Sequence, residues 1–503
     1  MGLFVMMNRV ASSVFALAMS QVLLPAALAE DAETEALKAR IEKLEADNAK
    51  LMAMVERLVD AAEIDRISPA PTATPDNGET TVEYRETPGA IGIDPSYGYK
   101  LTDHAEGVNK KRILQLKARQ SGELDRVVTL SGGITAIADY QTSNRDDKFG
   151  YLMRHPTLNN QIGDTASEAV LHNATLAATA NLTDDITAYI EFLYDPEQSF
   201  GSGTITSLTR NQVQLRRGYV MWGNLDKTPL YAAIGKMDTP FGMNDTVSPF
   251  TNSTVWHSFA GLAYGAEVGY LKDGLSLRAM AIQGGAQFRA ANTSVDGTNV
   301  PSKLNNFAVD ANYTADLGEG NDVMLGASYE HGSPYCQSYP VVHFNPCDDN
   351  NPAWSTYGAM DYGPFRILAE YAQTTDVWPG SEVPDLTNPL SQYAAQKTKS
   401  YMLGGRYGFG TEVEDGLMQS ALSLEFSTFV AGDEGAPWEN QDQWVLGYSR
   451  YLVANVNLFG ELIHVDGYAP LNFVSGGNLD DGSTWSDRDG KTDVILVGAQ
   501  AAF

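Results

Sequence analysis

Three things are scarce in this chain of 503 residues: cysteine, long apolar runs and basic side chains. Two cysteines are too few for a disulfide framework to hold such a large fold together. After the first 29 residues, no stretch approaches the roughly 18 consecutive apolar residues of a membrane-spanning helix. Because 63 acidic residues outnumber 34 basic ones, the net charge is −29, which argues against binding to nucleic acid.

Catalytic signatures are missing as well. The chain contains no G-x-S-x-G, no H-E-x-x-H and no glycine-rich phosphate loop, and its seven histidines are scattered. We therefore predict no catalytic residue, no cofactor and no resident metal. Plentiful instead are glycine, tyrosine and phenylalanine, with 46, 24 and 18 residues, a composition that suits a large exported β protein.

Residues 1–29 have the three parts of a secretory signal. Arg9 is the only charged residue, an apolar stretch runs from Val14 to Leu24, and Ala27-Leu28-Ala29 is a small-residue cleavage site. The mature chain would then begin at Glu30. An exported membrane protein without spanning helices must be a closed β-barrel, because every backbone polar group in hydrocarbon needs an internal partner.

The last twelve residues, Thr492 to Phe503, read TDVILVGAQAAF and alternate apolar and polar side chains up to a terminal aromatic. Strands of soluble proteins also end in Phe, so the ending indicates a membrane barrel only in combination with the export signal and the rest of the chain. Together they resemble outer-membrane β-barrel proteins. The resemblance implies that this strand closes the barrel, that the assembly machinery recognises Phe503, and that lipid and lipopolysaccharide surround the protein.

Residues 126–503 alternate in the way expected of a strand meander, which predicts an all-β fold, a 16-stranded antiparallel transmembrane barrel. Connections after odd strands are long and those after even strands are short, as in barrels with short periplasmic turns and long external loops. An even number of strands leaves both termini in the periplasm. The predicted strands are 126–140, 167–182, 185–195, 211–224, 229–236, 263–271, 274–284, 305–315, 321–330, 354–361, 364–374, 398–409, 417–428, 443–452, 455–465 and 492–503.

One parity of these strands is apolar and should face lipid, so the other parity should line the lumen. The lumen would carry seven acidic residues, namely Glu191, Glu267, Asp310, Glu330, Glu370, Glu425 and Glu461. Four basic residues would oppose them: Arg216, Arg278, Arg366 and Arg406. This excess of acid predicts a mild preference for cationic, zwitterionic or metal-complexed solutes. The alternative for each charge is a structural pair across neighbouring strands.

The connection 237–262, with the sequence DTPFG near its start, resembles the third external loop of porins, which folds into the barrel and narrows it. The resemblance implies that Lys236 projects near a constriction, opposite Asp238 and Asp245. Trp256 and His257 would then supply apolar and hydrogen-bonding contacts to a solute. The alternative is an uncommitted surface loop.

The order of signal, heptad segment, linker and barrel also resembles a narrower group: the phosphate-selective, DcaP-like and LbtU-type siderophore porins. The stretches QLKARQSGEL and GNLDKTPLYAAIGK carry the local resemblance. The phosphate-selective type has a basic ladder in its channel, from which this acidic chain departs. We therefore favour the LbtU type among these relatives.

Residues 30–62 form a heptad segment, and residues 63–125 a linker that ends in a basic stretch. A coiled-coil seam predicts a homo-oligomer, a parallel dimer by heptad rules or a homotrimer as in many porins; the alternative is one helix packed on the barrel. The basic stretch 110–119 could line the periplasmic mouth, touch peptidoglycan, or be a solvated helix face. The seam residues are Leu37, Ile41, Leu44, Asn48, Leu51, Val55 and Leu58.

Both cysteines, Cys336 and Cys347, fall in one long loop. In an oxidising exported compartment, two cysteines this close predict a disulfide. The same loop also holds His331, His343 and two aspartates, so a zinc or iron site is the alternative.

These patterns predict an outer-membrane porin that gives passive, size- and charge-filtered diffusion to small hydrophilic solutes. A siderophore-type uptake porin is the alternative within transport. The rival of another class is a structural tether, in which residues 30–125 reach the cell wall and the barrel is only an anchor.

Overall fold

The computed structural model describes residues 90–102, 110–146, 149–151, 163–195, 212–284, 303–336, 350–378, 393–414, 417–436, 438–468 and 486–503. Residues 86–503 make up one compact unit. The predicted signal at 1–29, the heptad segment at 30–62 and Cys347 lie outside the described residues.

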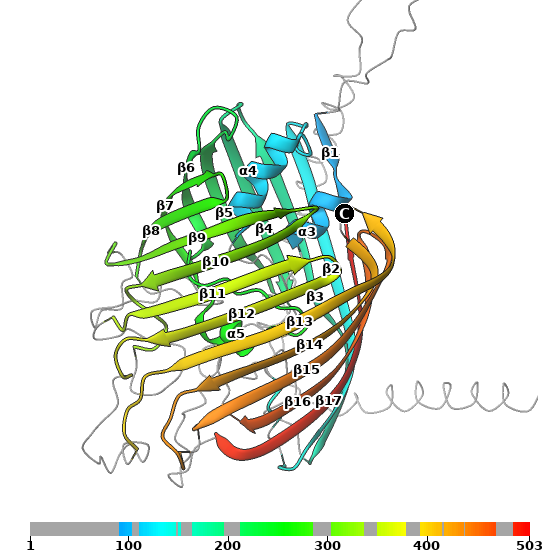
Figure 1. Ribbon diagram of the computed structural model, residues 1–503, viewed down its shortest axis with the longest axis vertical. Coiled ribbons are helices and arrows are strands. Elements are labelled where there is room, and N and C mark those ends of the chain that lie inside the picture. The colour runs from blue at the N-terminus through cyan, green and yellow to red at the C-terminus, as the bar shows by residue number, and fades with distance from the viewer. Residues whose placement is uncertain are drawn as a thin grey trace, which may run out of the picture. The chain divides into compact units, whose positions relative to one another are not determined.

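Sixteen antiparallel strands, β2 to β17, close into a barrel (Figure 1). Each strand pairs with its neighbours in sequence, and β17 pairs with β2 to complete the ring. The prediction of a closed barrel with sixteen strands is therefore confirmed. The strands are β2 (Val128–Ser143), β3 (Thr165–Asn181), β4 (Ile186–Asp195), β5 (Gln212–Gly223), β6 (Leu230–Asp238), β7 (Leu262–Lys272), β8 (Leu275–Ile282), β9 (Asn306–Gly318), β10 (Asn321–Glu330), β11 (Ala353–Tyr362), β12 (Phe365–Thr374), β13 (Lys399–Glu414), β14 (Leu417–Val430), β15 (Asn440–Val453), β16 (Val456–Tyr468) and β17 (Asp487–Ala502).

Tight turns join consecutive strands at one end of the barrel, the end where both termini of the chain were predicted to lie. Between β7 and β8, for example, Asp273 and Gly274 have φ values of 50° and 80°. Two successive positive φ angles give a turn whose twist matches that of the paired strands, and Asp-Gly is one of the residue pairs that favour it. The sequence thus encodes the hairpin directly.

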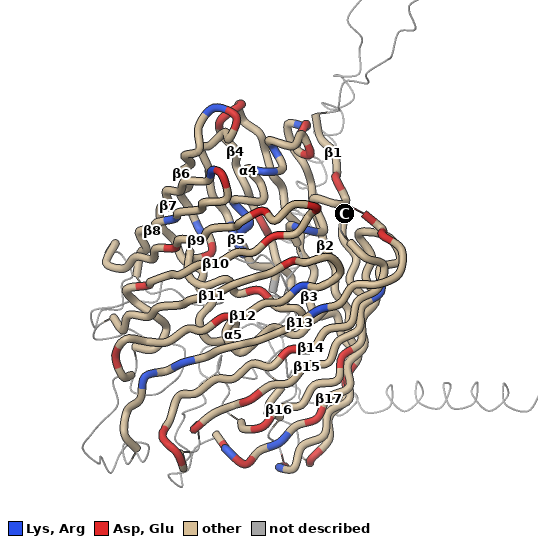
Figure 2. Tube along the Cα trace, viewed as in Figure 1, with Lys and Arg blue, Asp and Glu red and all other residues tan. Residues whose placement is uncertain are grey.

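The outward face of the barrel is apolar. In β17, Ile495 and Val497 are 58% and 55% exposed, whereas Val494 and Leu496 between them are buried. Such a continuous exposed apolar surface is far larger than a water-soluble monomer carries, and it suits a lipid environment. Acidic residues are visible at both rims of the barrel in Figure 2. No helix among the described residues is long and apolar enough to span a membrane.

Aromatic side chains form contacts across adjacent strands near each rim of this apolar belt. At the long-loop end, neighbouring rings lie 4.6–6.4 Å apart from β11 to β15. Aromatic girdles of this kind mark the two interfaces of a membrane barrel. The long-loop series is Trp354, Tyr371, Tyr401, Phe426 and Trp444, and the opposite series is Phe365, Tyr407 and Phe409.

Two helices precede the first barrel strand and lie at its inner side: α3 (Pro95–Thr102) and α4 (Lys111–Ser121). The helix α4 ends at Gly122, which has φ 82° and caps it in the left-handed conformation. A short strand β1 (Ile91–Ile93) pairs in parallel with the start of β2, beside the point where β17 stops. Phe503 continues the β17–β2 pairing through two backbone hydrogen bonds to Gly132 of 2.8 and 2.9 Å.

Candidate functional site

The connection between β6 and β7 folds into the barrel. Every residue from Thr239 to Ala260 is buried except Pro249, which is half-buried. The segment includes a short helix, α5 (Thr254–Phe259), whose first turn is capped by the Ser253 hydroxyl accepting from the Trp256 amide. We call residues 239–261 the inserted loop. Its burial sets it apart from a surface loop.

Three glutamates on alternate strands hold the inserted loop by its backbone. Glu370 on β12 accepts hydrogen bonds from the amides of Met243 and Asn244, at 3.0 and 2.8 Å. A carboxylate that accepts amide hydrogen bonds makes charge-assisted contacts, which are stronger than bonds between neutral groups. We call Glu370, Glu425 and Glu461 the carboxylate ladder.

The other two members bind the loop further along. Glu425 on β14 accepts from the Val247 amide at 3.0 Å and from the hydroxyl of Thr246 at 2.6 Å. Glu461 on β16 accepts from the amides of Phe250 and Thr251 at 2.8 and 3.0 Å, and from the Thr251 hydroxyl at 2.5 Å. Acids expected to line the lumen therefore serve to fix the loop against the wall.

Glycines on the wall allow this close approach. A Cβ atom at Gly404 would lie 2.5 Å from a methyl of Val247, and one at Gly447 would lie 2.5 Å from the ring of Pro249. Serines add further contacts, with the Thr254 amide donating to Ser427 at 3.1 Å.

Trp256 and His257 lie on α5. Their rings are 4.9 Å apart and perpendicular, and both side chains are more than nine-tenths buried. Their contacts shape the inserted loop from within, and their role toward a solute stays a prediction.

The helix α4 brings basic side chains into the interior. The Arg112 guanidinium, 1% exposed, donates to both carboxylate oxygens of Glu267 at 2.9 and 2.8 Å, and to the Asp238 carbonyl at 2.9 Å. Burial acts to lower the pKa of Arg112, but the Glu267 carboxylate, together with Tyr219 and Tyr231, raises that pKa overall. These contacts show that Arg112 lies within the barrel and not on a solvated face, whereas Lys117 of the same stretch is exposed.

A second buried charge cluster surrounds Glu191. Lys111 donates to it at 3.1 Å and Arg217 at 2.5 Å, while Arg217 also binds both carboxylate oxygens of Asp238 at 2.8 and 2.6 Å. Burial lowers the pKa of the Lys111 ammonium, against the opposite effect of Glu191. A β-bulge between Glu191 and Phe192 shifts the pairing with β5, so Arg217, not the predicted Arg216, binds these acids. Arg216 is buried too.

Asp245 joins the inserted loop to both α4 and the wall. Its carboxylate lies 2.6 Å from the Lys110 ammonium and 3.7 Å from the guanidinium of Arg366, which also binds Asp361 at 3.0 Å. Three parts of the interior therefore meet at one aspartate.

Lys236 is not part of this junction. Its ammonium donates to the Leu215 carbonyl at 2.8 Å and lies 5.9 Å from the centre of the Tyr264 ring. The alternation of β6 puts it on the parity of Ile234, which is 65% exposed on the lipid side. The predicted position opposite Asp238 and Asp245 is thus not what the structure has, because Lys236 shares the outward parity.

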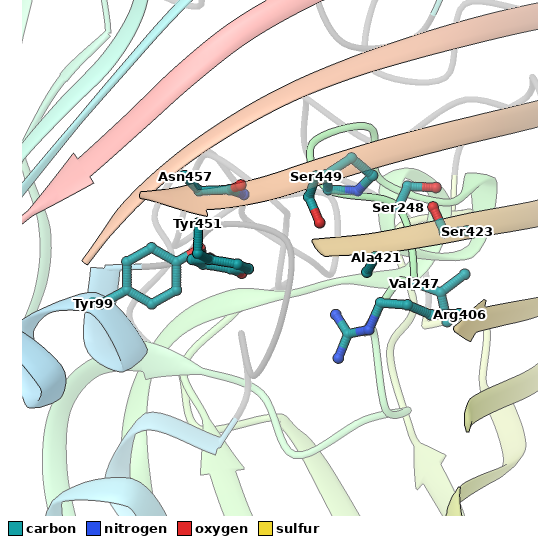
Figure 3. Close-up of a pocket in the computed structure, with 10 residues that line it drawn as sticks. Tyr99, Val247, Ser248, Arg406, Ala421, Ser423, Ser449, Tyr451 and Asn457 are labelled. Atoms are coloured by element: carbon teal, nitrogen blue, oxygen red, sulfur yellow. Dashed lines mark hydrogen bonds between the residues drawn. The ribbon is translucent and has the colours of Figure 1, made fainter. Parts of the chain in front are cut away.

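The remaining predicted wall charges are distributed along the barrel. Arg278 on β8 pairs with Asp310 on β9 at 2.8 Å, and Tyr357 donates to the same aspartate. Glu330 is 1% exposed at the end of β10. Arg406 on β13 lines a cavity between the inserted loop and α3 (Figure 3).

The enclosed part of this cavity is small, about 20 Å³, because the roughly 330 Å³ of free space among its lining residues includes open solvent. Strands β13 to β16 form its wall, the inserted loop covers one side and α3 the other. Its lining is Tyr99, Val247, Ser248, Pro249, Arg406, Ala421, Ser423, Ser449, Tyr451 and Asn457.

Comparison with known proteins gives similarity of architecture only. No family model and no curated protein matches the chain. Among solved structures, it is similar to an anion-selective porin from Comamonas acidovorans, with 14% identity, 75% of this chain and 99% of that chain covered, and a TM-score of 0.47. The outer membrane channel DcaP of Acinetobacter baumannii is 17% identical, with 75% of this chain and 97% of that chain covered and a TM-score of 0.45. OprB of Pseudomonas putida is 10% identical, with 77% of this chain and 97% of that chain covered and a TM-score of 0.46. Identities this low, with TM-scores below 0.5, say nothing of the function of this chain.

Proposed function

We propose that this chain is a porin of the bacterial outer membrane, which lets small hydrophilic solutes diffuse passively through a lumen narrowed by the inserted loop. The observation that carries the proposal is the buried loop fixed to the inner wall of an apolar-faced barrel by the carboxylate ladder. A barrel that served only as an anchor has no need to hold a loop across its interior.

Size filtering in this proposal comes from the inserted loop together with α4. The loop lies against β10 to β16, and α4 binds acids of β4 and β7. Solutes would therefore pass beside two fixed elements, which Lys110 and Asp245 join, and this favours a filter of constant width.

Charge filtering in this proposal is weak. The seven predicted wall acids, together with Asp238 and Asp245, face eight bases once Lys110 and α4 are counted. Those bases are Lys110, Lys111, Arg112, Arg216, Arg217, Arg278, Arg366 and Arg406. A small acidic excess supports a mild preference for cationic, zwitterionic or metal-complexed solutes, and the amide contacts of the carboxylate ladder reduce it further.

Single-channel recording of the folded mature protein in a planar bilayer tests the proposal. A stable channel with a small reversal potential of cation-preferring sign in a KCl gradient is the expected result. A folded protein that conducts no ions at any voltage would contradict it. A clear preference for chloride would retain the porin and refute the mild cation preference.

Oligomerisation and assembly belong to the same proposal. The heptad residues would join copies as a homotrimer or dimer, and the assembly machinery would read Phe503, which ends the closing strand. Crosslinking of the full chain against a chain lacking residues 30–62 tests this: loss of the oligomer on deletion is expected, and an unchanged oligomer would assign self-association to the barrel.

A tether role would fall to residues before α3, since Lys111 and Arg112 of the basic stretch are engaged inside the barrel. Removing residues 30–89 leaves α3 and α4 in place. We expect unchanged conductance in that variant; loss of envelope integrity alongside it would favour the tether.

A further inference from the structure

Lys236, predicted to lie at the constriction, lies instead on the outward face of β6. Ile234 of the same face is 65% exposed, and Tyr264, which pairs with Lys236 across β6 and β7, is 39% exposed. The outward face of the flanking strands is apolar, with Val213 and Val268 exposed by 68% and 60%. A charged ammonium group therefore lies in a surface that suits lipid.

Along β6, Lys236 is close to the long-loop end of the strand. The strand begins at Leu230 after a short turn, and the inserted loop begins just beyond Asp238. At about 3.3 Å per residue, Lys236 lies about 20 Å along the tilted strand from Leu230. Because charge in hydrocarbon is costly, a lysine in such a place extends its ammonium to the nearer polar interface. In the proposed orientation, that interface belongs to the outer leaflet.

Among the described residues, no carboxylate is paired with Lys236. Its ammonium donates to the Leu215 carbonyl at 2.8 Å, beyond the last residue pair of β5 and β6. The charged groups close enough to act on it are Arg216 and Arg217, both basic, and Arg217 is already paired with Asp238. An ammonium has three N–H donors, so two donors and the positive charge are left for a further group.

Tyr264 brings a second donor next to this ammonium. Its ring centre lies 5.9 Å from the Lys236 nitrogen, on the same outward face. A tyrosine at a membrane interface places its ring among apolar chains and its hydroxyl toward the headgroups. An ammonium beside a phenol hydroxyl suits an anionic oxygen acceptor, and in a lipid leaflet the phosphate groups supply such oxygens.

We propose that Lys236 and Tyr264 form a binding site for a phosphate group of the outer-leaflet glycolipid, the lipid part of lipopolysaccharide. The phosphate would accept hydrogen bonds from the ammonium and the phenol hydroxyl, and the acyl chains would pack on Val213, Ile234 and Val268. The site lies outside the lumen, so it goes beyond the proposed diffusion function and uses only the proposed place in the outer membrane. It would bind the leaflet to β6, the strand from which the inserted loop starts.

Native mass spectrometry of the folded mature protein with added lipid tests the proposal. Lipid A that carries its two phosphates should bind roughly tenfold more tightly than dephosphorylated lipid A, because charge-assisted hydrogen bonds are lost with the phosphates. Lys236→Gln should weaken binding of the phosphorylated form by a similar factor, whereas Lys236→Arg keeps the charge and should retain most of it. Lys272→Gln is the matched control, because it removes an exposed lysine from the short-turn end of β7 and should change nothing.

Several results would overturn the site. Lys236→Gln that binds lipid A as the wild type does would refute it, and so would equal binding of phosphorylated and dephosphorylated lipid A. Inorganic phosphate that displaces the lipid at millimolar concentration would show a site for the free ion and refute the lipid assignment. An oligomer that Lys236→Gln separates while lipid binding stays unchanged would mean that Lys236 contacts a second copy.

Two further readouts separate the site from the fold and from the channel. If Lys236→Gln folds poorly, the comparison of the two forms of lipid A on the wild type decides alone. Since the site faces away from the lumen, Lys236→Gln should conduct as the wild type does in a planar bilayer. A wild type that binds lipid A through Lys236 but conducts nothing would refute the porin and leave the site intact.

Discussion

Replacing Glu461 by alanine should release the part of the inserted loop that lies on β16. The carboxylate accepts from the amides of Phe250 and Thr251 and from the Thr251 hydroxyl. Without it these three donors lose a buried acceptor at once. The strand pairing of the barrel uses none of these groups, so the effect should be confined to the loop.

The magnitude follows from the three contacts. Each hydrogen bond to a charged acceptor contributes about 1.5–3 kcal/mol to the stability of the docked loop. Because all three bonds go to the same carboxylate, their contributions add up to less than the sum. We therefore expect Glu461→Ala to weaken docking by roughly 3–6 kcal/mol. That raises the population of the detached segment by roughly a hundredfold to ten-thousandfold, since 1.4 kcal/mol is a factor of ten. Glu461→Gln keeps one acceptor oxygen and loses only the charge, so about tenfold is expected.

Hydrogen exchange at the two amides measures this population directly. If exchange proceeds through local detachment, the rates at Phe250 and Thr251 should rise by the factors given above. Channel recordings should show larger and noisier current from the same variant, because a detached loop no longer has a fixed position.

Asp493→Ala serves as the matched control, because it removes an exposed carboxylate from the neighbouring strand β17, where the Asp493 carboxylate lies 2.7 Å from a ring nitrogen of His464. It should change neither exchange nor current. Protection of Phe250 and Thr251 that survives Glu461→Ala unchanged would refute the view that the carboxylate ladder fixes the loop.

Two further perturbations probe the N-terminal helices. Arg112→Gln and Glu267→Gln should each lower barrel stability by about 3–5 kcal/mol, whereas the double variant should lose less than the sum, as thermal unfolding followed by gel mobility would show. Additive losses would mean that α4 does not depend on this pair. Gly98→Val would place a Cβ atom 2.1 Å from the carbonyl of Phe503, so we expect a low yield of folded barrel, while Gly405→Val, with open space around it, should fold normally. Equal yields would contradict a packed C-terminal seam.

All sixteen strands could be read from the sequence because alternation and turn chemistry act locally. The Asp273-Gly274 turn and the outward series around Ile495 need no knowledge of distant contacts. The bounds differ most at the rims: β17 begins at Asp487 instead of Thr492, and β13 runs to Glu414 instead of Phe409. Beyond the apolar belt no lipid enforces alternation, so the strands continue there without a pattern to reveal them.

The interior was harder to predict because it depends on contacts between distant residues. Period-2 counting cannot detect the bulge that makes Arg217 the partner of Glu191. It also cannot show that a wall glutamate accepts loop amides. One signal was available for α4: a dense basic stretch directly before the barrel of an acidic chain, with Arg112 placed to meet inward carboxylates.

The carboxylate ladder recognises the inserted loop mainly through amide groups, which every residue except proline possesses. Substitutions at Met243, Asn244, Val247 or Phe250 would thus leave most of the hydrogen bonds to the carboxylate ladder intact. Evolution could therefore change the side chains of the inserted loop while the loop keeps its position in the barrel. The same barrel can in this way hold inserted loops of different specificity.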